Sequence, residues 1–362
     1  MRAEDGPAAV SRRRALGTIA TAAAAALLAG CAGGRRGRGP GVMGAGWPYP
    51  TLTGARPLVI AHRGASGWRP EHTLASYRLA IGMGADFIEP DLVMTRDGVL
   101  VARHDIHLSG TTDVAERPEF ADRRRRVGDR EDWFVSDFTW AELSTLRTRQ
   151  PFPGRDHAFD GKERIPRLDE ILALVREAEA AGRRVGIYPE IKQRPFFLEE
   201  GLDPVPALAE ELRRAGFTDP ARLFLQAFEP ETVRAMGEAI AAPLVQLVDA
   251  GPGPDGRLVP SVPLEEAARH AQVAGPSLAL LLTPEGADTG YVARAHELGL
   301  AVHPWTLRDD RLPPGVTDAR ALYRAVFALG VDAVFTDFPD TAVAVIRDVA
   351  RAATAGEERG MS

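Results

Sequence analysis

The 362-residue chain contains a single cysteine, Cys31. With one cysteine no intramolecular disulfide can form, so the folded chain depends on a packed core even in an oxidising compartment. The same scarcity argues against a zinc site built from a cysteine cluster. At this length the hydrophobic content of 45% is enough for one large core or two smaller ones. α/β barrels often reach such a size as a single domain, and two compact domains are the alternative.

Lysine is almost as scarce, because Lys162 and Lys192 are the only basic residues that are not arginine. The 44 basic residues stand against 50 acidic ones, which gives a net charge of −6. Beyond the N-terminus no basic block is long enough to wrap nucleic acid, so no nucleic-acid partner is expected. Because nearly every basic residue of this chain is arginine, a lysine at a candidate site indicates a specific role for that lysine.

A long apolar run suited to a membrane span is also missing. The most apolar segment, 15–30, is short, rich in alanine and preceded by Arg12-Arg13-Arg14. The arginines resemble a twin-arginine export signal, and Leu28-Ala29-Gly30-Cys31 resembles a lipobox, where bacterial lipoproteins are cleaved and lipidated. We therefore expect 1–31 to be a signal and Cys31 to carry a lipid, although an ordinary buried cysteine is the alternative. The mature protein would then be exported and anchored at the outer face of the cytoplasmic membrane or in the periplasm.

After a stretch rich in Gly, Pro and Arg at 32–56, expected to be a flexible tether, short apolar runs alternate with amphipathic stretches as far as residue 351. The tail at 352–362 is expected to be frayed. Strands are predicted at 57–62, 86–94, 99–104, 184–192, 222–228, 243–248, 277–282, 300–306 and 333–336, and helices at 168–181, 205–215, 231–239, 264–272, 291–298, 321–329 and 341–350. This is close to eight repeats, with one extra short strand beside the second. Polar residues end many strands rather than meeting at one switch point, which favours an α/β fold of the (β/α)₈ TIM-barrel type over a doubly wound sheet.

Residues 106–166 interrupt the alternation, since they are charged and too long for an ordinary connection. We expect an insertion over the C-terminal mouth of the barrel. Its run Arg123-Arg124-Arg125-Arg126 is predicted to be a solvated face, and a phosphate-binding patch is the alternative.

Carboxylates gather at two predicted strand ends. Glu89 and Asp91 are two residues apart on one strand, so both point into the barrel, and Glu190 and Lys192 repeat this spacing on another. Burying carboxylates together costs several kcal/mol unless a cation shares them. Three such oxygen ligands suit Mg²⁺ or Ca²⁺, and salt bridges capping the barrel are the alternative.

Two histidines end predicted strands, His62 the first and His104 the third. Either alone is as readily structural, but two at neighbouring strand ends indicate an acid and a base. Arg63 and Lys192 would then hold phosphate oxygens. Together these residues suit the cleavage of a phosphodiester.

The ordered set of motifs resembles the glycerophosphodiester phosphodiesterase family over nearly all of residues 57–345. The motifs are His62-Arg63-Gly64-Ala65, Pro70-Glu71-His72-Thr73, Glu89-Pro90-Asp91-Leu92, His104-Asp105, Pro189-Glu190-Ile191-Lys192, Gln226-Ala227-Phe228 and Thr336-Asp337-Phe338-Pro339-Asp340. The stretches 187–192 and 112–115 resemble the periplasmic bacterial branch in particular. Any one motif would be weak evidence, whereas the ordered set is highly specific.

The resemblance implies a TIM barrel in which Glu89, Asp91 and Glu190 hold one divalent cation, with Ca²⁺ favoured over Mg²⁺. It implies that His62 and His104 are the acid and base, that Arg63 and Lys192 contact phosphate, and that Glu71 lies near the site. The implied reaction is hydrolysis of deacylated phospholipids to sn-glycerol 3-phosphate and an alcohol, through attack of the neighbouring glycerol hydroxyl on phosphorus and hydrolysis of the cyclic phosphate. This chain departs from the family pattern at position 72, where His72 replaces the usual asparagine.

Aromatic residues near the predicted site are less informative. Trp305, two residues beyond His303, is expected either to stack on the substrate or to pack in the barrel. His303 is expected to be structural, and Phe228 and Phe338 to be pocket walls at most.

Three other functions compete with this reading. A lipid-directed phospholipase of the same fold should carry an apolar loop at the mouth, whereas the insertion is charged, with Trp133-Phe134 and Trp140 as its main apolar points. A lipoprotein that only binds phosphodiesters needs no acid and base, and a glycosidase needs no pair like Arg63 and Lys192. The sequence predicts neither the head group preferred nor the oligomeric state.

Overall fold

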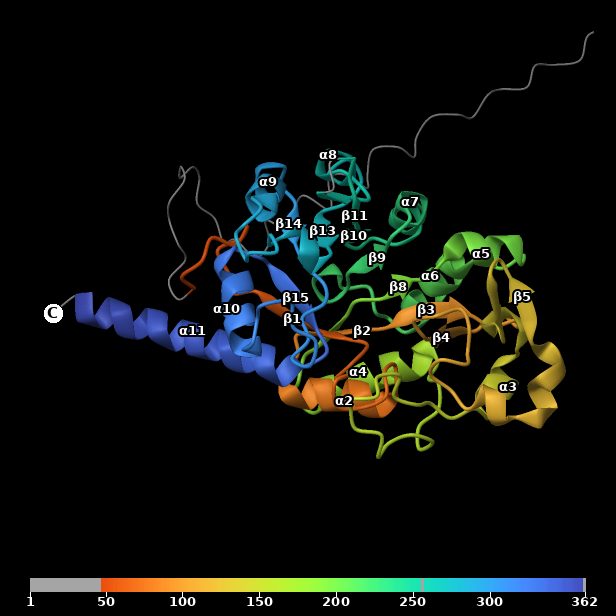
Figure 1. Cartoon of the computed structure of the whole chain (residues 1–362). Helices are drawn as coiled ribbons and strands as arrows, with labels where there is room; N and C mark the ends of the chain where they lie inside the picture. Colours follow the sequence, from red (N-terminus) through yellow and green to blue (C-terminus); the bar gives the residue numbers. More distant parts are fainter. Residues whose placement is uncertain (1–46, 255–256, 361–362) are drawn as a thin grey trace, which may run out of the picture.

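A computed structural model of the chain describes residues 47–254 and 257–360. Within them eight parallel strand positions close into a barrel that is surrounded by helices, which confirms the predicted TIM barrel (Figure 1). In order around the barrel the strands are β1 (Leu58–His62), β2 with β3 (Phe87–Glu89 and Asp91–Met94), β7 with β8 (Gly186–Ile187 and Glu190–Ile191), β9 (Leu225–Ala227), β10 (Leu244–Val248), β13 (Val273–Pro276), β14 (Ala301–Val302) and β15 (Ala333–Thr336). Backbone hydrogen bonds from Asp332 to Val302 (2.9 Å) and from Phe335 to Pro304 (3.0 Å) join β14 to β15 and close the ring.

Prolines divide the second and third barrel strands. Pro90 separates β2 from β3, and Pro189 separates β7 from β8. Proline has no N–H to donate to the ladder, but its carbonyl still accepts: Glu190 N donates to Pro90 O at 3.0 Å and Gln226 N to Pro189 O at 3.1 Å. The strands therefore continue across each break, and the carboxylates beside the prolines stay in register.

A helix follows each barrel strand. These helices are α2 (Leu74–Met83), α4 (Leu168–Ala180), α6 (Pro204–Arg214), α7 (Pro230–Ala239), α8 (Leu264–Ala267), α9 (Tyr291–Glu297), α10 (Ala319–Ala328) and α11 (Pro339–Gly360). The sequence prediction omits α2, which begins where the side chain of Thr73 accepts from the N–H of Ser76 and ends at Gly84, whose φ of 97° suits glycine. Short additions beyond the eight repeats are α5 (Arg194–Glu199), η4 (Pro220–Arg222) and the hairpin of β11 (Ala250–Pro252) and β12 (Leu258–Pro260).

Two predicted elements need correction. The predicted strand at 277–282 is wrong, because the sixth barrel strand is β13 and Leu278–Leu280 form the 3₁₀ turn η5. Leu280 and Leu281 are buried in this turn, and an apolar run alone does not distinguish a buried turn from a strand. The predicted helix at 264–272 shrinks to the four residues of α8. The extra strand is confirmed as β4 (Leu100–Ala102), which pairs antiparallel with β3.

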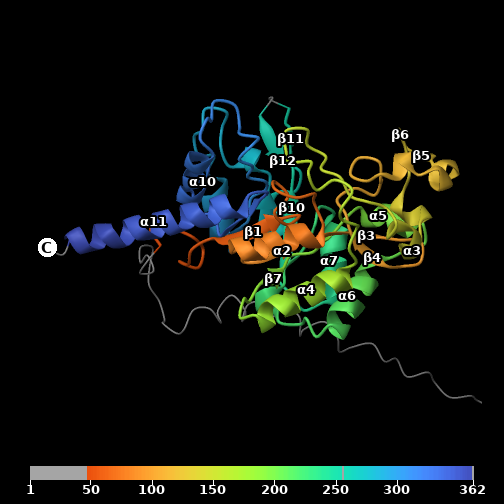
Figure 2. The ribbon, with the colours of Figure 1, turned by 90° about the horizontal axis from the view of Figure 1, so that it is seen from below.

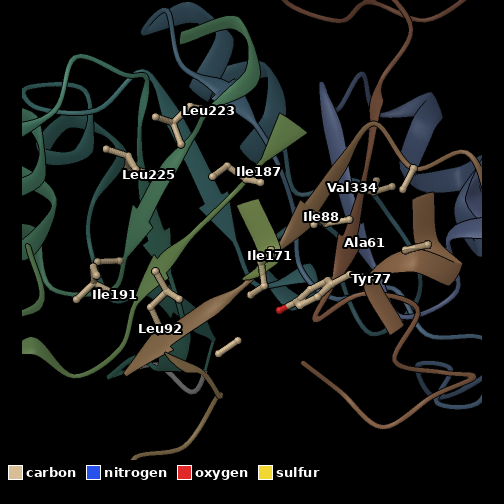
Figure 3. Close-up of a cluster of buried hydrophobic side chains, with 14 of the residues drawn as sticks. Ala61, Tyr77, Ile88, Leu92, Ile171, Ile187, Ile191, Leu223, Leu225 and Val334 are labelled. Atoms are coloured by element: carbon tan, nitrogen blue, oxygen red, sulfur yellow. The ribbon is translucent and has the colours of Figure 1, made fainter. Parts of the chain in front are cut away.

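Apolar residues fill the structure on both sides of the barrel wall. Inside the barrel, Ile60, Phe87, Tyr188, Val245 and Phe335 belong to one buried cluster. Between strands and helices a larger cluster includes Tyr77 of α2 and Ile171 of α4, which Figure 3 shows among strand residues such as Ile88 and Ile187. Alternate strand residues thus face the two cores, which leaves the strand ends for polar groups.

The segment before β1 is packed on the barrel. Trp47 is only 4% exposed and packs edge-on against Phe327 of α10. Leu52 donates its N–H to Oδ1 of Asp332 at 2.7 Å and contacts the interior cluster. The prediction of a flexible tether is therefore wrong for residues 47–56. Its first part, the export signal and Cys31 lie outside the described residues.

The insertion 106–166 lies to one side of the barrel (Figures 1 and 2). It holds η1 (Val114–Glu116), η2 (Pro118–Arg123), β5 (Arg125–Val127), β6 (Arg130–Asp132), η3 (Val135–Asp137) and α3 (Trp140–Leu143). Its four consecutive arginines make surface ion pairs, among them Arg125 with Asp137 (2.7 Å), as expected for a solvated face. Phe134 is 1% exposed, and Nε1 of Trp133 donates to the carbonyl of Phe120 at 2.6 Å, so these aromatics pack inward.

At the C-terminal end, α11 runs past the edge of the barrel in both views (Figures 1 and 2). Residues 352–360 continue this helix, in contrast to the frayed tail that we expected. Among the described residues we find no helix with the length and apolarity needed to cross a membrane.

Candidate active site

Three carboxylates meet where Pro90 and Pro189 divide the second and third barrel strands. Glu89 ends β2, Asp91 begins β3 and Glu190 begins β8, and strand register sets Asp91 opposite Glu190. One oxygen from each residue lies within 4.8 Å of the others. The residues are 1%, 1% and 4% exposed, so the cluster predicted from the two-residue spacing is present and buried.

Burial and the neighbouring charges shift the pKa values of this cluster. Burial raises the pKa of Glu190 to about 8, and burial together with Asp91 raises that of Glu89. Against the effect of burial, Lys192 and His72 hold the pKa of Asp91 well below its usual range. Oδ1 of Asp91 is buried without a hydrogen bond, and Oε1 of Glu190 is buried with the ammonium of Lys192 2.7 Å away. Three buried carboxylates at this spacing fit a hard divalent cation such as Mg²⁺ or Ca²⁺.

Lys192 and Arg63 bring positive charge to the carboxylates. Nζ of Lys192 lies 2.7 Å from Oε1 of Glu190 and 3.4 Å from Oδ1 of Asp91. Arg63 donates its backbone N–H to Oε2 of Glu89 at 2.7 Å, and its Nε lies 3.4 Å from Oδ2 of Asp91. Both residues line the same cavity, so both are available to an anionic substrate.

Glu71 lies beside the site without lining its main cavity. Nη1 of Arg63 donates to Oε2 of Glu71 at 2.9 Å. Arg63 has φ of 58°, a left-handed conformation that is uncommon for arginine. The contact with Glu71 and the backbone bond to Glu89 together hold Arg63 in this conformation.

His62 is fixed by a carboxylate that the sequence prediction did not assign. Its Nδ1 lies 2.6 Å from Oδ1 of Asp337, which follows β15. Because an ionised carboxylate only accepts, Nδ1 carries the proton and Nε2 is left as the basic atom. Burial and the neighbouring Arg63 lower the pKa of His62 to about 4, so the imidazole is neutral near pH 7.

His104 has the same arrangement at the edge of the site. Its Nδ1 lies 2.7 Å from Oδ1 of Asp105, and its side chain is 37% exposed. Burial, Lys192 and Arg63 lower the pKa of His104. The structure thus brings together two histidines, each orientated by a carboxylate, so that Nε2 of either can accept a proton or, once protonated, donate one.

One cavity of about 90 Å³ joins these groups. Its polar lining is His62, Arg63, Glu89, His104, Glu190, Lys192, Gln226, Thr306 and Arg308, and its apolar lining is Phe228, Leu247, Trp305 and Phe335. Trp305 is held by a hydrogen bond from Nε1 to the carbonyl of Gly275 (2.7 Å) and packs edge-on against Phe228. The cavity therefore has a charged side for a phosphate and an aromatic side for carbon groups.

Two expected residues lie elsewhere. His303 is 2% exposed inside the barrel, where its Nδ1 lies 2.9 Å from Oη of Tyr188, in keeping with the structural role expected. Phe338 does not line the cavity and instead packs edge-on against Trp68, so the expectation of a pocket wall is wrong for this residue.

Sequence reasoning assigned no role to Gln226, Asp337, Arg308 or Arg155. Gln226 donates to Oε1 of Glu89 at 3.1 Å, and Arg308 donates to Oδ2 of Asp337 at 2.8 Å. Gln226 and Asp337 belong to motifs of the family pattern, which could have marked them, and Arg308 follows Trp305 by three residues. Arg155 lies in the insertion and offers no local pattern that would have marked it.

Comparisons with known proteins point to one family. The sequence pattern of the glycerophosphoryl diester phosphodiesterase family matches residues 62–341. A glycerophosphodiester phosphodiesterase of Haemophilus influenzae is 32% identical over 336 residues, covering 81% of this chain and 90% of the relative. The Arabidopsis thaliana enzyme GDPD6 is 32% identical over 323 residues, covering 79% of this chain and 85% of the relative.

Solved structures show the same fold. A crystal structure from Silicibacter pomeroyi, described as a glycerophosphoryl diester phosphodiesterase, aligns with a TM-score of 0.63 at 27% identity, covering 82% of this chain and 95% of that one. An Oleispira antarctica phosphodiesterase in complex with the product sn-glycerol-3-phosphate aligns with a TM-score of 0.58 at 23% identity, covering 82% and 99%. With the matched segment spanning most of the barrel, the chain belongs to the glycerophosphoryl diester phosphodiesterase family of enzymes.

Proposed function

We propose that this enzyme hydrolyses glycerophosphodiesters to sn-glycerol 3-phosphate and an alcohol, with a divalent cation and with His62 and His104 as the acid/base pair. The observation that carries the proposal is the single cavity lined by both histidines and by members of the buried carboxylate cluster. The product bound to the Oleispira antarctica phosphodiesterase supports the choice of substrate class.

Each group then has a position suited to its step. Lys192 and Arg63 bind the phosphate oxygens, and a cation held by Glu89, Asp91 and Glu190 would supply Lewis-acid stabilisation of the phosphoryl oxygens. Nε2 of one histidine accepts the proton of the glycerol hydroxyl that lies next to the phosphorylated carbon. As that oxygen bonds to phosphorus, the bond to the alcohol breaks, and the other histidine, in its protonated form, donates a proton to the departing oxygen.

The second half of the reaction reverses these roles. The histidine that lost its proton takes one from water, whose oxygen adds to phosphorus, and the other histidine protonates the glycerol oxygen that leaves. The cyclic phosphate opens to glycerol 3-phosphate. Either histidine can begin as base, because the carboxylates Asp337 and Asp105 leave Nε2 free on both.

The alternative of a lipid-directed phospholipase finds no support in the insertion. Exposed large apolar side chains among the described residues are Trp68, Leu198, Leu258 and Val259, and none belongs to residues 106–166. The insertion therefore lacks the exposed apolar loop that a lipid-directed enzyme would need there.

The reaction is tested by incubating the full chain with glycerophosphocholine or glycerophosphoethanolamine and measuring glycerol 3-phosphate. We expect release that stops with a chelator, returns with Ca²⁺ or Mg²⁺ and is lost in Glu190→Gln. Glu131→Gln, a change at an exposed glutamate of the insertion, is the matched control. Unchanged release in the presence of chelator would refute the metal requirement, and no release from either substrate would refute the substrate class.

We also propose that the protein is exported, belongs with the periplasmic branch of the family and is anchored through a lipid on Cys31, with Ca²⁺ as its native cation. The twin-arginine and lipobox resemblances at 12–14 and 28–31 support the export and the anchor. Mass spectrometry of the protein purified from membranes should show a diacylated N-terminal Cys31, and Cys31→Ser should remain uncleaved. A cleaved and water-soluble Cys31→Ser protein would contradict the anchor.

A further inference from the structure

His72 lies behind the carboxylate cluster and touches two buried groups. It belongs to the loop between β1 and α2 and is 2% exposed. Its Nε2 lies 2.9 Å from Oδ2 of Asp91, and its Nδ1 lies 2.8 Å from Oη of Tyr77. The imidazole therefore bridges helix α2 to the first residue of β3.

The chemistry of the partners sets the direction of both hydrogen bonds. An ionised carboxylate has no proton to give, so Nε2 of His72 donates to Asp91. In the neutral imidazole Nδ1 then accepts from the hydroxyl of Tyr77, which is fully buried. The result is a chain of donors that starts at Tyr77 and ends on Asp91.

These hydrogen bonds from Tyr77 through His72 occupy one oxygen of Asp91 and leave the other oxygen without a hydrogen bond. Oδ2 accepts from His72 and lies 3.4 Å from Nε of Arg63, whereas Oδ1 is buried with no hydrogen bond and lies 3.4 Å from Nζ of Lys192. A carboxylate that could rotate would present either oxygen to the cluster. With His72 in place, Oδ1 is the oxygen available as a ligand.

We propose that His72 is a positioning residue that fixes Asp91 so that Oδ1 faces the divalent cation, an inference that rests on the metal dependence proposed above. Groups that orientate metal ligands in this way contribute to affinity without touching the ion. The departure from the family pattern at position 72 thus coincides with a contact to a metal-ligand candidate.

The backbone at this position allows a clean substitution. His72 has φ of 54°, in the left-handed region that histidine and asparagine both adopt more readily than most residues. His72→Asn therefore keeps the backbone preference. Its amide atoms lie closer to the backbone than Nε2 of histidine does, so it cannot bridge both Tyr77 and Asp91.

The fold offers a matched control at the opposite end of the barrel. Nε2 of His296 lies 2.9 Å from Oδ2 of Asp332, which precedes β15. His296→Asn removes a histidine contact of the same kind and length far from the cation. Tyr77→Phe removes only the hydroxyl that donates to Nδ1, and it carries the test should His72→Asn fail to fold.

The experiment is isothermal titration calorimetry of Ca²⁺ and Mg²⁺ into the full chain, with circular dichroism to check folding. We expect a dissociation constant about 10- to 100-fold higher for His72→Asn, a smaller rise for Tyr77→Phe and none for His296→Asn. Glu190→Gln should abolish binding. Unchanged affinity in His72→Asn and Tyr77→Phe, with binding lost in Glu190→Gln, would overturn the positioning role alone. No cation binding by the wild-type chain would overturn the proposed metal dependence and this inference with it.

Discussion

Asp337 joins His62 to an arginine of the insertion. Its Oδ1 lies 2.6 Å from Nδ1 of His62, and its Oδ2 accepts from Nη2 of Arg155 at 2.5 Å. Arg308 donates to the same Oδ2 at 2.8 Å. Two guanidinium groups keep Asp337 ionised and hold it in place, so the tautomer and direction of His62 depend on residues far away in the sequence.

Asp337→Asn should slow the reaction without changing the fold. An amide that donates to Nδ1 would place the imidazole proton on Nε2, where the base is needed. We expect kcat to fall by about 100-fold or more with little change in KM, since general acid–base catalysis contributes about 10²- to 10⁴-fold. Steady-state kinetics check this, with Asp160→Asn as the control at the exposed pair of His157 and Asp160. Equal kcat values for the two variants would contradict the role of Asp337 in orientating His62.

Arg155→Met should destabilise the protein. The Arg155 side chain is 2% exposed and also binds Asp310 at 2.7 Å and the carbonyl of Ser66 at 3.0 Å. Removing one member of a buried ionic network costs about 3 kcal/mol, because the remaining charges are left buried and less well paired. Urea denaturation measures the loss. The exposed pair of Arg126 and Glu131 provides the control Arg126→Met, for which we expect about 0.5 kcal/mol or less. Similar losses in both variants would contradict a special role of Arg155.

Acid should destabilise the barrel through His303. Burial lowers the pKa of His303 to about 4, against about 6.5 in the unfolded chain. A lowered histidine pKa gives stability that is complete above the unfolded value and is lost as pH falls through about 6.5 towards about 4. The loss amounts to about 3 kcal/mol in that window. His303→Gln cannot be protonated, so its free energy of unfolding should fall less between neutral and acidic pH. An identical pH dependence in the two proteins would show that His303 does not titrate in this way.

The carboxylate cluster gives a pH effect of opposite sign. Burial raises the pKa of Glu190 to about 8 in the metal-free protein, from about 4.5 in the unfolded chain. A raised carboxyl pKa gives stability that is present below about 4.5 and is lost as pH rises through about 8. In chelator the melting temperature should therefore fall towards alkaline pH, and added Ca²⁺ or Mg²⁺ should raise it more at alkaline than at acidic pH. Glu190→Gln should lose the cation-induced rise and show a smaller alkaline fall, because Glu89, whose pKa burial also raises, remains. The same cation-induced rise at every pH would contradict the account.

The sequence allowed much of the site to be predicted because its residues stand at strand ends. The two-residue spacing of Glu89 with Asp91 and of Glu190 with Lys192 is visible locally, and parallel strands bring their carboxyl ends to one edge. The barrel itself follows from repeated strand and helix patterns. These features need no knowledge of loop paths.

Contacts that depend on loop paths could not be predicted. Arg155 and Asp337 are 182 residues apart, and no local pattern links them. Trp47 lies in a stretch whose Gly, Pro and Arg content is typical of a tether, yet its single indole is buried against α10. At 277–282 the apolar run fits a strand as well as a turn, and only the packing of β13 beside β10 and β14 decides between them.

The central claim is that His62 transfers protons in the cavity that the carboxylate cluster shares. The most direct test is kcat for glycerophosphocholine hydrolysis by the full chain carrying His62→Gln, at saturating cation, beside the exposed control His157→Gln. The account predicts a fall in kcat of about 100-fold or more for His62→Gln, with cation affinity unchanged, and wild-type kcat for His157→Gln. A His62→Gln protein that keeps kcat within about threefold of wild type would contradict it.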